Sequence, residues 1–281
     1  MMEKPVILTK KEAEKIMRKA SSGEKGKINV SFDLGVSYVP VDVDSDSFSA
    51  NDQCIPVAWL SRIKENACYV FKENEFRKIA LFSEETNFYY KLLPSQDWPT
   101  ITLSSTPMHR HVNLSPKKDT ALKILAVSPV KGRVLDTCCG LGYTAIAAAK
   151  HAAEVHVFER DENVLAIAGY NPYSQDLFLN KKIRLCRGNV FDGIKNFPHN
   201  FFDRIIHDPP TLKYSPELYS NEFYLQIFRV LKPGGLLYHY TPCPHKTKKR
   251  LFYPKVMKRL ADAGFKDVKY IEEASGVRAK K

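Results

Sequence analysis

The sequence predicts an α/β protein: a doubly wound, mostly parallel sheet preceded by a smaller α+β domain. Two observations carry this. From residue 115 onward, strand-like and helix-like runs alternate, which is typical of a parallel sheet covered by helices on both faces. Before residue 115, apolar residues recur at every second position in short runs separated by turn-rich clusters. We therefore expect two domains, residues 1–114 and 115–281.

The first domain is expected to open with a helix and continue in strands. Thr9 followed by Glu12 is typical of a capping box, which would begin a helix that runs to about residue 20. The remaining elements are expected, in order, as a strand at 28–36, a short helix at 56–64, and two or three strands within 68–93.

The second domain is expected to hold the ligand. Ser115 and Pro116 would begin its first helix, leading into 121–127. Strands are expected at 133–136, 155–158, 183–186, 204–207 and 236–240, with helices at 144–150, 162–168 and 217–231. Because ligands of such sheets bind beyond the carboxyl ends of the strands, the loops that follow each strand are where chemistry is expected.

Composition excludes several classes of protein. The chain has 281 residues, of which 44% are hydrophobic and 26% charged, as in ordinary folded domains. No apolar run approaches the length of about 20 residues that a membrane-spanning helix needs, and no signal-peptide core is present. None of the six cysteines forms a C-x-x-C pair, so we expect a cytoplasmic protein with no metal site.

The net charge of +12 is concentrated near the end of the sequence. Residues 246–281 contain twelve basic and four acidic side chains. Such a stretch attracts polyanions, which favours RNA as a partner, although a solvated lysine-rich surface is equally compatible with the count.

The first chemical motif follows the strand expected at 133–136. Cys138, Gly140 and Gly142 are small enough for the backbone to turn sharply and approach a ligand, and Asp136 and Thr137 stand beside that turn. An acid here would repel a pyrophosphate but suits a cationic ligand. We interpret the five residues as a cofactor site.

The second motif is the acid that ends the next strand. Glu159 lies 23 residues after Asp136, where a carboxylate can accept hydrogen bonds from both ribose hydroxyls. The alternative is a surface glutamate paired with Arg160, which we also assign to the cofactor site.

The third motif follows the third strand. Asn189 carries an amide that could read an adenine edge, and Val190 or Phe191 could cover the face of the base. An ordinary loop is the alternative.

The fourth motif is Asp208-Pro209-Pro210-Thr211, at the end of the fourth strand. The prolines stiffen the backbone and lack N–H donors. Asp208 and the Pro209 carbonyl would then form a rigid pair of acceptors for an –NH₂ group. We interpret these four residues as the catalytic centre, with a simple strand terminator as the alternative.

With these motifs in place, the sequence resembles the class I S-adenosylmethionine-dependent methyltransferases, which have a Rossmann-like fold. The resemblance spans residues 134–235 and includes Leu231-Lys232-Pro233-Gly234-Gly235, which is similar to the turn before that family's fifth strand. Asp208-Pro209-Pro210-Thr211 is similar to the (Asp/Asn/Ser)-Pro-Pro-aromatic motif of enzymes that methylate amino or amide nitrogens. S-adenosylmethionine is the cofactor that the resemblance implies.

Three positions depart from the family pattern. Cys138 replaces a glycine, Asn189 stands where aspartate is commoner, and Thr211 replaces the aromatic residue on which a base would stack. Tyr214 is the nearest candidate for that stacking role.

The layout is similar to archaeal methyltransferases associated with N4 methylation of ribosomal cytidine. The expected reaction is therefore methyl transfer to an exocyclic amino nitrogen of a base in RNA, with ribosomal cytidine N4 as the first candidate. His109 and Arg110 would contribute to substrate binding, or else belong to an interdomain linker, and the first domain would take part in substrate recognition.

Four alternatives remain open. The same acceptor pair would serve N6 of adenine, a glutamine amide in a protein, or a small-molecule amine. A non-catalytic RNA-binding protein is disfavoured because Asp136, Glu159 and Asp208 are all intact.

Overall fold

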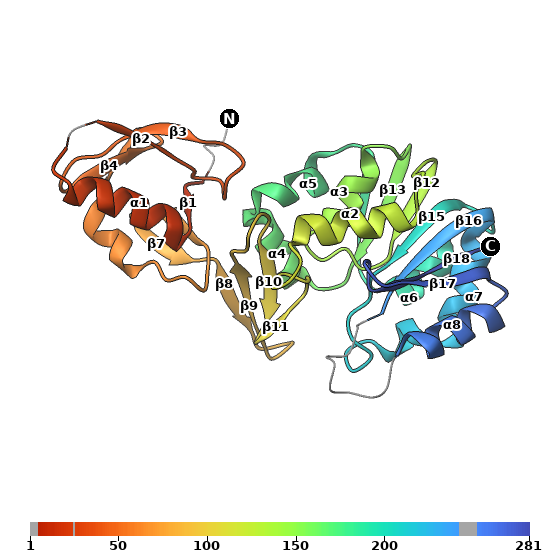
Figure 1. Cartoon of the computed structure of the whole chain (residues 1–281). Helices are drawn as coiled ribbons and strands as arrows, with labels where there is room; N and C mark the ends of the chain where they lie inside the picture. The colour runs from red at the N-terminus through yellow and green to blue at the C-terminus, as the bar shows by residue number, and fades with distance from the viewer. Residues whose placement is uncertain (1–4, 25, 242–251) are drawn as a thin grey trace. The chain divides into compact units, whose positions relative to one another are not determined.

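The computed structural model describes residues 5–24, 26–241 and 252–281 (Figure 1). The chain divides into two compact units, the first made of Met1–Pro116 and Ala166–Gln175, the second of Lys117–Leu165 and Asp176–Lys281. No helix in the described ranges is both long enough and apolar enough to cross a membrane.

The first unit consists of one helix, α1 (Lys10–Ser21), and short antiparallel strands. Its largest sheet has the order β11-β10-β9-β8, and a second has the order β1-β6-β7. The strands are β1 (Ile7–Leu8), β2 (Lys27–Val30), β3 (Val39–Asp42), β4 (Ser47–Ala50), β5 (Gln53–Pro56), β6 (Tyr69–Lys72), β7 (Glu75–Lys78), β8 (Ala80–Ser83), β9 (Phe88–Leu93), β10 (Thr100–Leu103) and β11 (Thr106–Pro107), with the 3-10 helix η1 (Val57–Arg62) after β5.

Local expectations for this unit are partly wrong. Thr9 precedes α1 but makes no side-chain capping bond, and Glu12 is buried and accepts a hydrogen bond from the Ser31 N–H at 3.3 Å. The strand expected at 28–36 ends at Val30, because Leu34 and Gly35 adopt positive φ angles of 56° and 94° that turn the chain. Four strands, not two or three, lie between residues 69 and 93.

The second unit is a seven-stranded sheet of order β14-β13-β12-β15-β16-β18-β17. The first five strands in this order are mutually parallel, and β18 runs antiparallel to both of its neighbours. The strands are β12 (Arg133–Asp136), β13 (Glu154–Glu159), β14 (Ile183–Arg187), β15 (Phe202–His207), β16 (Leu231–Tyr240), β17 (Lys266–Ile271) and β18 (Gly276–Lys280). The predicted α/β fold with a mostly parallel, doubly wound sheet is confirmed.

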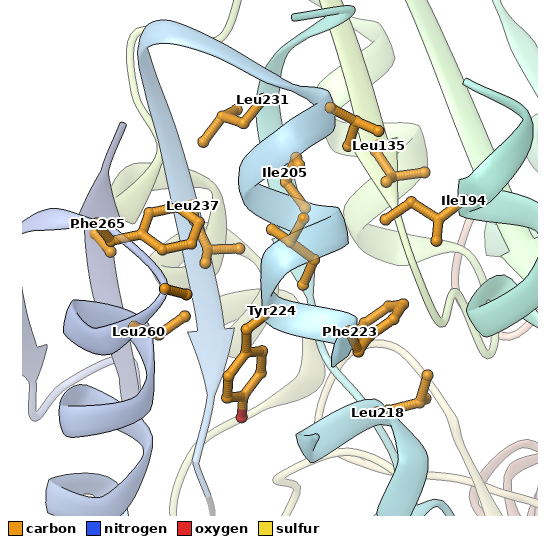
Figure 2. Close-up of a cluster of buried hydrophobic side chains, with 14 of the residues drawn as sticks. Leu135, Ile194, Ile205, Leu218, Phe223, Tyr224, Leu231, Leu237, Leu260 and Phe265 are labelled. Carbon is orange, nitrogen blue, oxygen red and sulfur yellow. The ribbon is translucent and has the colours of Figure 1, made fainter. Parts of the chain in front are cut away.

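Helices cover both faces of this sheet. They are α2 (Pro116–Ala126), α3 (Tyr143–Ala149), α4 (Glu162–Tyr170), α5 (Gln175–Leu179), α6 (Val190–Gly193), α7 (Asn221–Val230) and α8 (Tyr253–Asp262), with 3-10 helices η2 (Pro172–Ser174), η3 (Ile194–Asn196) and η4 (Pro216–Tyr219). One core cluster joins the sheet to α7 and α8, and Figure 2 shows its Leu135, Ile205, Leu237, Tyr224 and Leu260. A second cluster packs the opposite face against α2 and α3.

The helix expected at 217–231 is two separate elements. The chain forms η4, breaks at Ser220, and restarts as α7, whose first turn is capped by the Ser220 hydroxyl accepting from the Phe223 N–H at 3.1 Å. A serine at this position satisfies an N–H that the helix itself leaves unpaired, so it favours a helix start over a continuous helix. The break shapes the loop between β15 and α7.

Candidate active site

The carboxyl ends of β12, β13, β14 and β15 lie along one edge of the sheet, because these strands are parallel and adjacent. The direction in which the chain winds reverses between β12 and β15, and such reversal points are where open α/β sheets bind ligands. Four of the predicted motifs follow these four strand ends.

Asp136 at the end of β12 is fully buried. Its Oδ2 accepts a hydrogen bond from the Thr144 hydroxyl at 2.6 Å, whereas its Oδ1 has no hydrogen-bond partner within the described ranges. Burial raises the pKa of Asp136 to about 6, and the negative charge of Asp208 raises it further, so the two carboxylates lie close enough to interact. A buried carboxylate with an unused oxygen suits a cationic or N–H-bearing ligand.

The turn after β12 depends on glycine. Gly140 and Gly142 have φ angles of 53° and 78°, which side-chain-bearing residues rarely adopt. A Cβ on Gly142 would also lie 2.9 Å from a methyl group of Leu177. Cys138, between β12 and these glycines, is partly buried, and burial raises the pKa of its thiol well above the ordinary value, which keeps the thiol neutral.

Thr137 ties the ends of β12 and β15 together. Its hydroxyl lies 2.7 Å from Nδ1 of His207, and Nε2 of His207 lies 3.1 Å from the Leu218 carbonyl. Because a carbonyl can only accept, Nε2 carries the proton and Nδ1 accepts from Thr137. Burial lowers the pKa of His207 well below its usual range, so the ring is neutral. Sequence reasoning did not assign His207 a role.

Glu159 at the end of β13 faces the same loop. Its Oε2 accepts from the Gly140 N–H at 2.9 Å and its Oε1 from the Asp161 N–H at 3.0 Å. Burial raises the pKa of Glu159 to about 7. Each carboxylate oxygen can accept more than one hydrogen bond, so both retain capacity for hydroxyl donors.

Arg160 does not pair with Glu159. Its guanidinium donates to the Tyr214 carbonyl at 3.0 Å and lies 3.4 Å from a Glu217 carboxylate oxygen. The side chain therefore links the end of β13 to the loop after β15, and its predicted contact with a cofactor would have to be made alongside these bonds.

Asn189 caps α6. Its Oδ1 accepts from the Phe191 N–H at 3.0 Å, which leaves the amide N–H₂ to donate to a ligand. Val190 is 2% exposed and packs in the core cluster, so its side chain is engaged in the interior. Phe191 is partly buried and stacks on Phe223 with ring centroids 6.0 Å apart.

Asp208 is held by a buried lysine that sequence reasoning missed. Nζ of Lys123 on α2 lies 2.6 Å from Oδ2 of Asp208 and 2.7 Å from Oδ2 of Asp119. The Lys123 side chain is 4% exposed and that of Asp208 is 22% exposed. We refer to Asp119, Lys123 and Asp208 as the carboxylate–lysine triad.

The triad keeps its lysine charged. Burial alone lowers the pKa of Lys123, but the carboxylates of Asp208 and Asp119 more than reverse this and raise it above the ordinary value. Burial also raises the pKa of Asp208, and Lys123 opposes that rise. The one ammonium thus neutralises only part of the charge of two carboxylates.

The loop after Asp208 is tethered. The Tyr219 hydroxyl donates to the Pro210 carbonyl at 2.8 Å, and the Arg259 guanidinium on α8 donates to the Tyr219 carbonyl at 2.6 Å. Pro209 is buried, and no hydrogen bond to its carbonyl is seen in the described residues. Pro209 therefore keeps the acceptor that the sequence predicted.

Two of the remaining predicted residues are exposed on this loop. Thr211 and Tyr214 are both solvent-accessible, and the Lys213 ammonium lies 5.5 Å from the centre of the Tyr214 ring. Tyr214 can thus present an aromatic face, as proposed for base stacking.

His109 and Arg110 belong to the first unit. His109 Nδ1 lies 2.9 Å from the Thr100 hydroxyl, which in turn accepts from the His109 backbone N–H. Their part in substrate binding stays a prediction. Of the basic stretch, Lys246, Lys248, Lys249 and Arg250 lie outside the described residues.

Comparisons with known proteins agree with this geometry. Residues 134–235 match the family model described as a methyltransferase domain. The chain is 47% identical over 219 residues to "Uncharacterized protein MJ1233" of Methanocaldococcus jannaschii, covering 77% of this chain and 74% of that protein. It is 34% identical over 117 residues to YqeM of Bacillus subtilis, whose name describes a methyltransferase, covering 41% of this chain and 44% of that protein.

A solved structure of spermidine synthase from Thermotoga maritima has the same fold, with a TM-score of 0.54 and 17% identity over 71% of this chain and 70% of that chain. The fold and the matched domain define a class I S-adenosylmethionine-dependent methyltransferase. The chain belongs to the same family as MJ1233 of Methanocaldococcus jannaschii.

The residues present fit S-adenosylmethionine. The unused, buried Oδ1 of Asp136 suits the positively charged end of that molecule, and Glu159 retains acceptor capacity for its ribose hydroxyls. No group of three or more His, Cys, Asp or Glu side chains suited to a metal is found in the described part of the chain.

Proposed function

We propose that this methyltransferase acts on an exocyclic amino nitrogen of a base in RNA, with N4 of ribosomal cytidine as the first candidate. The observation that carries the proposal is Asp208. It follows β15, next to β12, with one oxygen fixed by Lys123 and with the Pro209 carbonyl beside it in the chain.

Asp208 and Pro209 would hold the amino group. A base –NH₂ has two N–H donors, and Oδ1 of Asp208 and the Pro209 carbonyl offer two acceptors whose positions are set by the proline pair. Because Lys123 contacts Oδ2, the substrate is expected to use Oδ1.

This pair of acceptors would favour the transition state. The lone pair of an aryl amine is delocalised into the ring, and hydrogen bonds that draw both N–H groups aside favour a pyramidal nitrogen and stabilise the positive charge that develops on it. S-adenosylmethionine supplies an already activated methyl group, so alignment of the nucleophile is the main remaining requirement.

The cofactor-binding roles are assigned as follows. Asp136 would receive the positively charged end of S-adenosylmethionine, Glu159 its ribose hydroxyls, and the Asn189 amide its adenine edge. Each side chain is held by a hydrogen bond of its own, at 2.6 Å, 2.9 Å and 3.0 Å respectively, so little freedom is lost when a ligand binds.

The test is to identify the methylated product. The protein is incubated with methyl-labelled S-adenosylmethionine and total RNA, the RNA is digested to nucleosides, and the labelled nucleoside is identified by mass. We expect methylated cytidine from the native chain and none from D208A. Label in N6-methyladenosine would move the proposal to adenine. Label only in a glutamine-containing peptide or a small amine would overturn it.

A further inference from the structure

Four basic side chains project from one exposed area of the sheet in the second unit. Lys266 and Lys269 lie on β17, and Arg278 and Lys280 lie on β18. All four are exposed. We call these four residues the cationic face.

Strand register places them on the same side. Lys266 pairs with Lys280 and Lys269 with Arg278, and directly paired residues project from the same face of a sheet. The alternate residues Val277 and Ala279 are buried in the core cluster that includes α8. The cationic face is therefore the side of β17 and β18 that α8 does not cover (Figure 1).

The same rows of the sheet continue to another cation. Lys280 pairs with Leu236, and Leu236 pairs with Arg204 on β15. Arg204 is 5% exposed, and its Nε donates to the Val127 carbonyl at 2.7 Å. Burial lowers the pKa of Arg204, and the nearby charge of Arg278 lowers it further. Positive charge is thus concentrated here at a cost.

No acidic group balances this charge. Within residues 5–24, 26–241 and 252–281, none of the four side chains forms an ion pair. Both cross-strand pairs bring like charges together, which is unfavourable for the sheet itself. The charge is also specific to one part of the chain: residues 1–116 contain 15 basic and 15 acidic side chains, and residues 117–281 contain 28 and 16.

Neither protection of a sheet edge nor membrane binding accounts for this charge as well as a polyanion does. Lysines on an edge strand prevent edge-to-edge association, but β18 lies between β16 and β17, so Arg278 and Lys280 are not on an edge. A membrane-binding surface needs apolar side chains to insert, and none of the large apolar residues exposed in the described chain lies beyond Leu225.

We propose that the cationic face binds the phosphate backbone of the RNA substrate without reading its sequence. This inference rests on the proposed function, since it names a surface outside the reaction centre that would hold the same RNA. Lys and Arg contacts of this kind release counterions from the nucleic acid, so each contributes to affinity in a salt-dependent way.

The test is the salt dependence of RNA binding by the full chain. A fluorescein-labelled RNA hairpin is titrated with the native protein and with the double variants K269Q/R278Q and K266Q/K280Q. The matched control is K11Q/K78Q, which removes two exposed lysines of the first unit that form no ion pair within the described residues. Calorimetry of S-adenosylmethionine binding checks that each variant is folded.

Losing two phosphate contacts should lower the slope of log K against log salt by about 1.5, which is roughly a 30-fold weaker affinity at 0.1 M salt. The control should bind like the native chain. Equal slopes for all four proteins would overturn the inference and leave the proposed function intact, since the latter is decided by the labelled nucleoside. Loss of binding to phosphatidylserine vesicles, with RNA binding unchanged, would also overturn it.

Discussion

The carboxylate–lysine triad makes a sharp prediction about stability. Replacing Lys123 with Met keeps the length of the side chain but leaves Asp119 and Asp208 buried without their shared cation. Removing one partner of a buried ion pair typically costs about 3–5 kcal/mol. We expect K123M to lose about 4 kcal/mol of unfolding free energy near pH 7, measured by urea denaturation.

The pH dependence of this loss identifies its cause. Without Lys123, the pKa values of the buried carboxyls rise above those of the unfolded chain, so the folded state binds more protons. Stability is then fullest below the unfolded pKa and falls as the pH rises through the folded pKa, so the loss should shrink toward about pH 4. The exposed lysine Lys131 provides the control variant K131M, which should change stability little. A loss below about 1 kcal/mol that does not vary with pH would refute the reasoning.

Three further predictions concern the site. D208A should lower methyl transfer by about 10²–10³-fold or more while leaving cofactor affinity within a few-fold by calorimetry; equal loss of both would place Asp208 in the cofactor site. Cofactor affinity should rise with pH through about 6 to 7, because burial raises the pKa of Asp136 to about 6 and of Glu159 to about 7 and the ligand prefers the ionised carboxylates. E159Q should remove the upper part of that rise, and an unaltered pH profile would contradict the ribose role. G142A should destabilise the fold by about 1–3 kcal/mol in urea denaturation, because φ is 78° and a Cβ would lie 2.9 Å from Leu177, and a neutral effect would contradict that constraint.

The sequence predicted the strand ends well because the evidence for them is local. Alternating strands and helices require a parallel sheet, and a parallel sheet brings Asp136, Glu159 and Asp208 to one edge. The small first-unit strands were less predictable. Their ends are set by turn residues such as Leu34 and by tertiary contacts such as Glu12 with Ser31, which no local pattern reveals.

Lys123 was missed for a different reason. It is separated from Asp208 by 85 residues, so no spacing rule links the two. A signal was nevertheless present. Lys123 is the one charged residue in the run from Ala121 to Val127, and Asp119 precedes it by one helical turn. A lone lysine inside an apolar helical run, with an acid four residues earlier, indicates a buried ion pair whose further partner must come from elsewhere.

The central claim is that the Asp208–Pro209 acceptors face the methyl group that is transferred. Its most direct test is a crystal structure of the chain with a cofactor analogue that carries an amino group in place of the sulfonium methyl. We expect that amino group within about 3 Å of Oδ1 of Asp208 or the Pro209 carbonyl, with the ribose hydroxyls on Glu159. An amino group directed away from both acceptors, or a ribose bound elsewhere, would contradict the account.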